Sequence, residues 1–244
     1  MKIIIMSMET DNRNKGMMKM DTNQAITEKI IATEWEMFIA VNEGEERASC
    51  QEDAETFGGM RRAQYDAWSD ETRQAYLDDL EAAKQAGRNL VEEKYIHMMQ
   101  TTEPSKYEAL LPRVKLPTEA ALSLAKDVSD MLLEQTRLLF EDYPYVSGHG
   151  RPLYSELDYG YTSVETYQLC ELYTYSEATL AALKKHIRAL ADAGGSLARM
   201  ILENTVRYYG YESLDTAEAA TKARVDKLGI QVSFGCCADE ECEL

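Results

Sequence analysis

The chain has 244 residues, of which 45% are hydrophobic and 28% are charged, and its formal net charge is −17. This composition is close to that of average soluble proteins, so it excludes disorder of the whole chain and predicts a compact fold. The acidic excess, 43 Asp and Glu against 26 Lys and Arg, opposes contact with polyphosphate, and we predict no nucleic-acid partner. No run approaches the roughly 18 apolar residues that a membrane-spanning helix needs, so we expect no membrane partner.

The N-terminus and the cysteines indicate a protein that stays in the cytoplasm. The opening Met-Lys-Ile-Ile-Ile-Met is too short for the apolar part of a secretion signal. Five cysteines are an odd number without the spacing of a disulfide framework, so reduced thiols are expected. The acidic C-terminal sequence contains Cys236, Cys237 and Cys242. Thiolates beside carboxylates can bind zinc or copper, but a fourth ligand is not evident, and we predict no metal and no other cofactor.

Along the chain, the pattern predicts helices and no sheet. Residues 1–22 lack a helical period and are expected to be a disordered tail. From Thr22 onward, apolar residues form a stripe wide enough for a core helix. All five prolines lie between residues 104 and 152, which leaves long stretches on either side free to be helical. We predict an all-α fold of about eight or nine helices.

The strongest internal signal is a repeat. Residues 68–90 align without gaps onto residues 175–197. The alignment matches a helix cap, a small-residue face and a glycine stop, at Ser69 and Ser176, Ala82 and Ala189, and Gly87 and Gly194. Upstream, Glu55-Thr56-Phe57 corresponds to Glu165-Thr166-Tyr167 after a short gap. We interpret the repeat as a duplication and predict two similar helical units packed about a pseudo-twofold axis.

This interpretation predicts one all-helical domain over residues 23–229, between two tails. Its parts are a first repeat at 23–103, a second repeat at 118–211 and a closing helix at 213–229. Residues 230–244 are expected to be a flexible acidic tail that carries the three C-terminal cysteines.

Several short motifs occur in order over roughly residues 25–218. They are Glu34-Trp35, Arg47-Ala-Ser-Cys50-Gln51 with Asp53, Met60-Arg61, Gly87-Arg88-Asn89-Leu90, Glu93-Lys94-Tyr95, Gly150-Arg151-Pro152, Glu165-Thr166-Tyr167 and Ile201-Leu202-Glu203-Asn204-Thr205. With these motifs the chain resembles the family called domain of unknown function 4125. That name carries no function, so the resemblance implies a shared fold and a shared site.

Two irregular segments contain the candidate ligand-binding residues. Residues 143–161 show no helical stripe and hold several tyrosines around a Ser-Gly-His-Gly-Arg-Pro run, which suits a binding loop more than a linker. The alternative is a packed connector whose tyrosines cover helix ends. Residues 42–53 carry polar groups just before a helix, where free N–H groups can receive an anion. The alternative there is ordinary capping by Asp53 and a surface ion pair of Arg47. The predicted ligand-binding residues are Arg47, Gln51, Asp53, His149, Arg151 and Tyr154.

The sequence supports catalysis less than binding. Glu55, Glu165 and Glu203 are candidates for an acid or a base. Cys50 is a candidate nucleophile at a helix start, but a buried and inert thiol is the preferred interpretation. His97 follows Glu93 by four residues and so shares a helix face with it, which we interpret as a surface pair and not as a metal site.

We therefore predict a helical protein that binds a small anionic or polar ligand in a polar and aromatic cleft between the repeats, or that acts as a scaffold for a protein partner. Arg47 and Arg151 would be related anchors in such a cleft. The alternative is a small-molecule enzyme that uses a glutamate as acid or base, with Arg and Tyr positioning the substrate. Trp35 and Trp68 are predicted to lie in the core.

Overall fold

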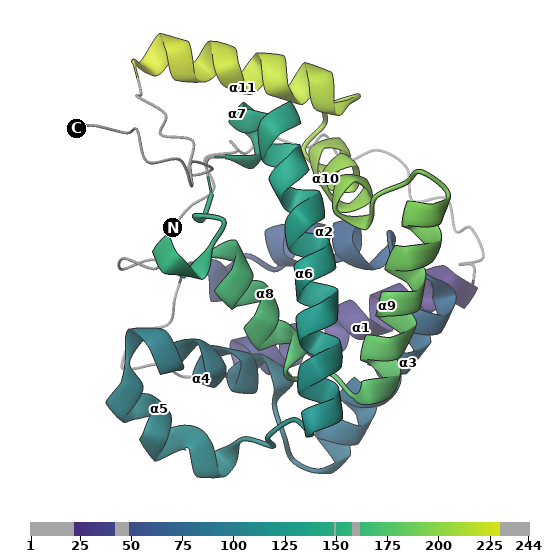
Figure 1. The fold of residues 1–244 in the computed structure, drawn as a ribbon, viewed down its shortest axis with the longest axis vertical. Helices are drawn as coiled ribbons and strands as arrows, with labels where there is room; N and C mark the ends of the chain where they lie inside the picture. Colours follow the sequence, from purple (N-terminus) through teal and green to yellow (C-terminus); the bar gives the residue numbers. More distant parts are fainter. Residues whose placement is uncertain (1–21, 42–48, 149, 158–161, 230–244) are drawn as a thin grey trace.

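The computed structural model describes residues 22–41, 49–148, 150–157 and 162–229. Within these ranges the chain forms eleven α-helices and no β-strand (Figure 1). The α-helices are α1 Thr22–Ile39, α2 Ala54–Tyr65, α3 Asp70–Gln85, α4 Leu90–Thr102, α5 Pro104–Leu110, α6 Glu119–Asp142, α7 Pro144–Ser147, α8 Val164–Leu172, α9 Glu177–Asp192, α10 Leu197–Tyr208 and α11 Leu214–Leu228. Three short 3-10 helices are η1 Ser49–Glu52, η2 Leu111–Arg113 and η3 Ser155–Leu157.

The all-α prediction is confirmed for the described residues, but the predicted number of helices was too low. The difference arises in the proline-containing region, where α5 and α7 begin at Pro104 and Pro144. Proline is tolerated at the first helical position because the N–H group there needs no partner within the helix. None of the helices in the described ranges is long and apolar enough to cross a membrane.

Side-chain caps and glycines determine where α3 and α9 begin and end. The Ser69 hydroxyl accepts a hydrogen bond from the Thr72 N–H group, and the Ser176 hydroxyl accepts one from Thr179, both at 3.2 Å. After these helices the backbone turns at Gly87 and Gly194, whose φ angles are 68° and 76°. A positive φ is costly for residues with a Cβ atom, so glycine is the residue that stops both helices.

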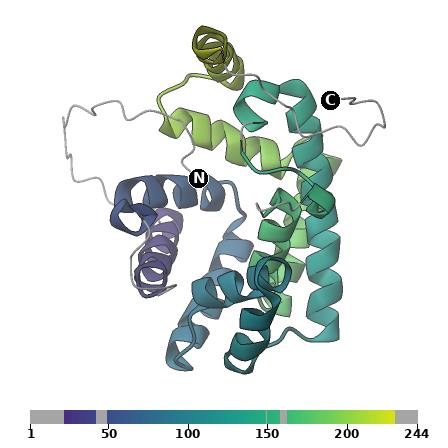
Figure 2. The ribbon, with the colours of Figure 1, turned by 90° about the vertical axis from the view of Figure 1, so that its left-hand side faces the viewer.

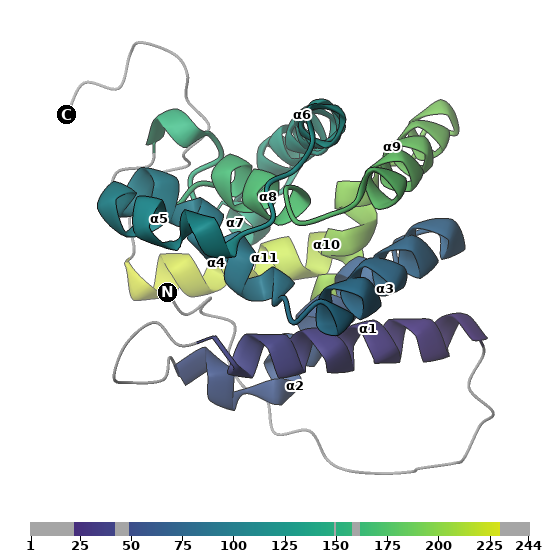
Figure 3. The same cartoon turned by 90° about the horizontal axis from the view of Figure 1, so that it is seen from below.

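The helices pack as two layers that share one core. Helix α3 packs against α9 at the centre, α1 covers α3 and α2, and α6 covers α9 and α8. Helix α10 packs on α2 and α6, and α4 packs on α8 and α1. Figure 3 shows the pair α1 and α3 and the pair α6 and α9 on two sides of the molecule.

An aromatic cluster fills the centre of this core. The rings of Tyr65, Trp68, Tyr76 and Tyr175 lie in mutual contact, with Tyr76 and Tyr175 4.7 Å apart between centroids. Trp68 is 5% exposed, which confirms its predicted place in the core. Trp35 is only partly buried and packs against the edge of the core.

Helix α11 lies at one end of the molecule, above α10 and α7 (Figure 2). Its Glu218 carboxylate accepts hydrogen bonds from the N–H groups of Tyr145 and Val146, both at 2.8 Å, and so anchors the start of α7. The Ser213 cap and Gly229, with φ 61°, bound the helix. The predicted tails at 1–22 and 230–244 lie outside the described residues, apart from Thr22, where α1 begins.

Candidate functional site

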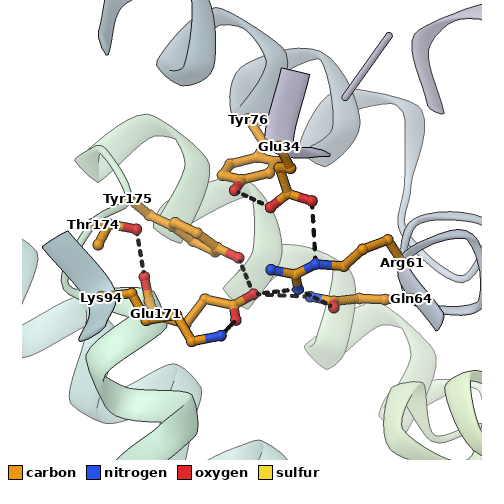
Figure 4. A network of polar contacts seen from close by, with 8 residues as sticks. All are labelled: Glu34, Arg61, Gln64, Tyr76, Lys94, Glu171, Thr174 and Tyr175. Carbon is orange, nitrogen blue, oxygen red and sulfur yellow. Dashed lines mark hydrogen bonds and ion pairs between the residues drawn. The ribbon is translucent and has the colours of Figure 1, made fainter. Parts of the chain in front are cut away.

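Four charged side chains meet in the interior where α1, α2, α4 and α8 come together (Figure 4). We call Glu34, Arg61, Lys94 and Glu171 the charge network. Glu34 is fully buried, Lys94 is 3% exposed and Glu171 is 9% exposed. Charged groups are rarely buried unless they are paired, so the pairing within the network decides whether this arrangement can exist.

Arg61 joins the two carboxylates of the network. Its Nε atom lies 3.2 Å from Oε2 of Glu34, and its Nη1 atom lies 3.1 Å from Oε1 of Glu171. The Lys94 ammonium pairs with the other oxygen of Glu171. Two cations and two carboxylates balance in charge, which offsets much of the cost of removing them from water.

Neutral side chains donate hydrogen bonds to one oxygen of each carboxylate. The Tyr76 hydroxyl donates to Oε1 of Glu34 at 2.7 Å, and the Tyr175 hydroxyl donates to Oε1 of Glu171 at 2.9 Å. Gln64 accepts from Arg61 Nη1 at 3.0 Å through its side-chain oxygen. The network is therefore held in one geometry from several helices.

The electrostatics keep Glu171 ionised. Burial alone would raise the pKa of its carboxyl group, but the charges of Arg61 and Lys94 outweigh burial and hold the pKa well below its ordinary range. Burial raises the pKa of Tyr76 and Tyr175, so both hydroxyls keep their protons and act as donors. These groups supply fixed charges and donors rather than proton transfer.

The network reaches the surface at a corner formed by Lys94, Tyr167 and Arg151, which we call the cationic corner. The Lys94 Nζ atom lies 3.5 Å from the centre of the Tyr167 ring, and the Arg151 Cζ atom lies 4.6 Å from it. Both contacts have the geometry of a cation over an aromatic ring. Lys94 is buried, whereas Tyr167 and Arg151 are partly exposed.

Arg151 is held over the start of α8 by its own segment of chain. Its Nη1 atom donates to the Thr162 carbonyl at 2.8 Å. The N–H group of Val164 donates to the Pro152 carbonyl, also at 2.8 Å, and Leu153 is fully buried. Within the described part of the chain, no carboxylate lies within ion-pair distance of Arg151. A cation without a carboxylate beside a partly exposed phenol is suited to receiving an anionic group.

Tyr167 differs in its electrostatics from the tyrosines of the core. The charge of Lys94 lowers the pKa of its hydroxyl, with a smaller contribution from Arg61, while burial and Glu171 act in the opposite direction. A perturbed titratable group beside a fixed charge partner is typical of functional sites.

The comparisons with known proteins identify the family. The model of a family described as a protein of unknown function, DUF4125, matches residues 24–219. The chain belongs to this family. Comparison with curated proteins and comparison with solved structures gave no match. Three motifs that carried the resemblance, Glu34-Trp35, Met60-Arg61 and Glu93-Lys94, each supply one member of the charge network.

The predicted ligand-binding residues that precede α2 are engaged in local structure. The Gln51 side chain donates to the carbonyls of Phe38 and Val41, both at 2.8 Å, and so closes the end of α1. Asp53 caps α2 by accepting from the Thr56 N–H group at 3.0 Å, and this hydrogen bond lowers the pKa of its carboxyl. A ligand role for either residue stays a prediction.

Of the other four predicted ligand-binding residues, the structure describes two, Arg151 and Tyr154. Arg151 belongs to the cationic corner, and Tyr154 packs against a small cluster that contains Leu153. Arg47 and His149 lie outside the described residues, so the convergence of Arg47 and Arg151 also stays a prediction.

The candidate catalytic glutamates belong to three different helices, α2, α8 and α10. Glu55 is exposed at the start of α2, and Oε2 of Glu165 accepts from the Ser155 N–H group at 2.8 Å. Glu203 pairs with Arg199 at 3.1 Å and with Arg207 at 3.4 Å. Catalysis by any of these three carboxylates stays a prediction.

Two expectations about burial were wrong. Cys50 is exposed, because the turn η1 directs its neighbour Gln51 inward and leaves the thiol outside. His97 and Glu93 are 5% and 3% exposed instead of lying on the surface, because α4 is packed between α1 and α8. Glu93 pairs with Arg88. In the described part of the chain, no group of three His, Cys, Asp or Glu side chains could hold a metal ion.

Sequence reasoning did not single out Arg61, Lys94, Tyr167 and Glu171 as one site. A usable signal was Glu34, which stands among apolar residues such as Ile30 and Phe38 on α1. A charged residue on the apolar face of a helix indicates a buried partner. The identity of that partner depends on packing between distant segments.

Proposed function

We propose that the protein binds a small anionic or polar molecule at the cationic corner. The observation that carries this proposal is that the Lys94 ammonium and the Arg151 guanidinium converge on one ring, that of Tyr167. Arginine matches the planar geometry of carboxylates and phosphates, and a partly exposed tyrosine adds a rigid surface and a hydroxyl group.

The charge balance supports an anionic ligand. In the interior, Arg61 and Lys94 are neutralised by Glu34 and Glu171, so Arg151 adds a positive charge that the network does not cancel. A chain with a net charge of −17 repels anions over most of its surface, so an anionic ligand needs a local excess of positive charge.

We also infer that the site lies at the junction of two duplicated helical units. The packing supports this inference, because α1 covers α3 and α2 as α6 covers α9 and α8, and α2 packs on α10 as α8 packs on α4. In the aligned repeats Asp79 corresponds to His186. Asp79 accepts from the Ser176 N–H group at 2.9 Å, and the His186 ring nitrogen lies 2.9 Å from the Ala67 carbonyl. Each residue therefore reaches the start of the opposite central helix.

A site at the junction would take its residues from both units, and the cationic corner does so. Lys94 comes from the first repeat, whereas Arg151 and Tyr167 come from the second. The upstream alignment that pairs Glu55 with Glu165 places Arg61 opposite Glu171, and these two side chains form the ion pair between the units. A ligand at the corner would contact both units.

The test is thermal unfolding in the presence of an anion panel of phosphate, pyrophosphate, citrate, succinate and pyruvate. At least one anion should raise the melting temperature of the wild type, because a ligand present at 100 times its dissociation constant adds about 2.7 kcal/mol to stability. Arg151→Gln should abolish the rise. Arg113→Gln is the matched control, since Arg113 is an exposed arginine paired with Glu92 at 2.9 Å, and it should keep the rise. An equal rise in Arg151→Gln, or no rise with any anion, would contradict the proposal.

A further inference from the structure

We propose, building on the binding site proposed above, that the ligand of the cationic corner is a small carboxylate and not a phosphate. The Arg151 guanidinium alone would hold the carboxylate, through two parallel hydrogen bonds. Three features of the corner support this ligand class: the open edge of Arg151, the enclosure of Lys94 and the hydrogen bonding at the start of α8.

The first feature is the edge of the Arg151 guanidinium formed by Nε and Nη2. The Nη1 atom donates to the Thr162 carbonyl at 2.8 Å, and the Cζ atom lies 4.6 Å from the centre of the Tyr167 ring. Among the described residues the guanidinium makes no other hydrogen bond and no ion pair, so the Nε and Nη2 edge is open. Two N–H groups that point in the same direction match the two oxygens of a carboxylate.

The second feature is that a ligand cannot reach the other cation of the corner. Lys94 is 3% exposed, and its ammonium pairs with Glu171. Arg61 lies 3.1 Å from the same carboxylate and holds it in place. Arg151 is therefore the one cation of the corner that a ligand can contact. It supplies one positive charge and one pair of parallel donors, which suits a group with one negative charge.

The third feature is that the first N–H groups of α8 already have acceptors. The N–H groups of Val164 and Glu165 donate to carbonyls of the two residues that follow Arg151, at 2.8 and 3.1 Å. The Thr166 N–H group donates to the Ser163 hydroxyl at 3.0 Å. A phosphate at the start of a helix is bound by such backbone N–H groups. These three groups cannot bind the oxygens of a phosphate that Arg151 leaves without a donor.

The charges near the corner also favour one negative charge over two. Oε2 of Glu165 accepts from the Ser155 N–H group at 2.8 Å, which fixes a carboxylate at the first turn of α8, two residues before Tyr167. This carboxylate and the net charge of −17 repel a doubly charged phosphate more strongly than a singly charged carboxylate.

The head group is tested by calorimetric titration of the full chain with benzoate and with phenylphosphonate, which carry different head groups on the same ring. Benzoate should bind about 5-fold more tightly, because the second negative charge of the phosphonate is repelled and gains no further donor. Benzamide, the neutral analogue of benzoate, should not bind. Phenylphosphonate that binds as tightly as benzoate, or benzamide that does so, would overturn the carboxylate assignment.

The two parallel hydrogen bonds are tested with Arg151→Lys, which keeps the charge but loses the pair of N–H groups. Benzoate should bind this variant about 10-fold more weakly than the wild type, since one charge-assisted hydrogen bond is lost. Arg113→Lys is the matched control at an exposed arginine that pairs with Glu92, and it should bind benzoate as the wild type does. Equal binding of benzoate to Arg151→Lys and to the wild type would overturn the two-bond geometry.

Failure of the ligand class and failure of the binding site give different results. If phenylphosphonate matches or exceeds benzoate and both are lost in Arg151→Gln, the carboxylate assignment is overturned and the anion site stands. If benzoate binds Arg151→Gln as tightly as the wild type, or if neither probe and no anion of the panel binds the wild type, the site at Arg151 is overturned as well.

Discussion

The Arg61 guanidinium lies 3.1 Å from the Glu171 carboxylate, although 110 residues separate the two in the chain. This contact joins α2 to α8 in the interior, and Lys94 on α4 depends on the same carboxylate. Removing the Glu171 charge would leave two buried cations with too few partners.

Glu171→Gln should therefore destabilise the fold by about 3–5 kcal/mol, the usual cost of breaking a buried ion pair. Urea unfolding followed by circular dichroism measures the change. Glu71→Gln is the control, because Glu71 forms an exposed pair with Lys185 at 2.6 Å and its loss should leave the midpoint nearly unchanged. Equal midpoints for the two variants would show that the charge network does not stabilise the fold.

The buried imidazole of His97 predicts a loss of stability in mild acid. Burial lowers the pKa of His97, so the unfolded chain takes up a proton before the folded chain does. The contribution of this residue is complete above the unfolded pKa of about 6.5 and is lost as the pH falls toward the lower pKa of the folded state. Between pH 7.5 and pH 5.5 the wild type should thus lose more stability than His97→Phe. A parallel loss in both proteins would contradict this assignment.

Gly59 permits the close approach of α2 and α10. A Cβ atom at this position would lie 2.1 Å from Cζ of Tyr208, whose hydroxyl donates to the Glu55 carbonyl at 3.0 Å. Gly59→Ala should cost about 1–3 kcal/mol, because the tyrosine ring must move. Gly58→Ala is the matched control in the same helix, since its nearest neighbour is Ile31 at 3.9 Å. That variant should be neutral or slightly stabilising. Urea unfolding compares the two variants, and a lower unfolding midpoint for Gly58→Ala than for Gly59→Ala would contradict the packing.

The two tryptophans should differ in their contribution to stability. Trp68 is 5% exposed within the aromatic cluster, and truncation to Ala should cost about 3–5 kcal/mol. Trp35 is partly buried and packs against Phe57 at 5.2 Å, so Trp35→Ala should cost less. Chemical denaturation of both variants provides the comparison, and a larger loss for Trp35→Ala would be inconsistent with the packing.

The parts of the fold that depend on local rules could be predicted from the sequence. The caps at Ser69 and Ser176 and the turns at Gly87 and Gly194 follow from hydrogen bonding and φ angles within a few residues. The short helices α5 and α7 were missed, because a proline that ends one helix can also begin the next.

The candidate site was harder to predict, because its geometry depends on contacts between distant segments. Lys94 and Glu171 are 77 residues apart in the chain. Each, taken alone, is a residue type that usually lies on the solvent-exposed face of a helix. Arg151 was identified from the irregular segment around it, but Tyr167 was noted in a repeated motif and not as a partner of Arg151. Contacts between these distant segments, which only the tertiary structure supplies, bring the side chains together in one corner.

A crystal structure with the anion that raises the melting temperature most is the direct test of the central claim. We predict that the anion contacts the Arg151 guanidinium beside the Tyr167 ring, with Lys94 still paired to Glu171. The competing location is a pocket of about 80 Å³ lined by Tyr143, Arg199 and Arg207 among others. An anion bound in that pocket, with none at Arg151, would contradict the account.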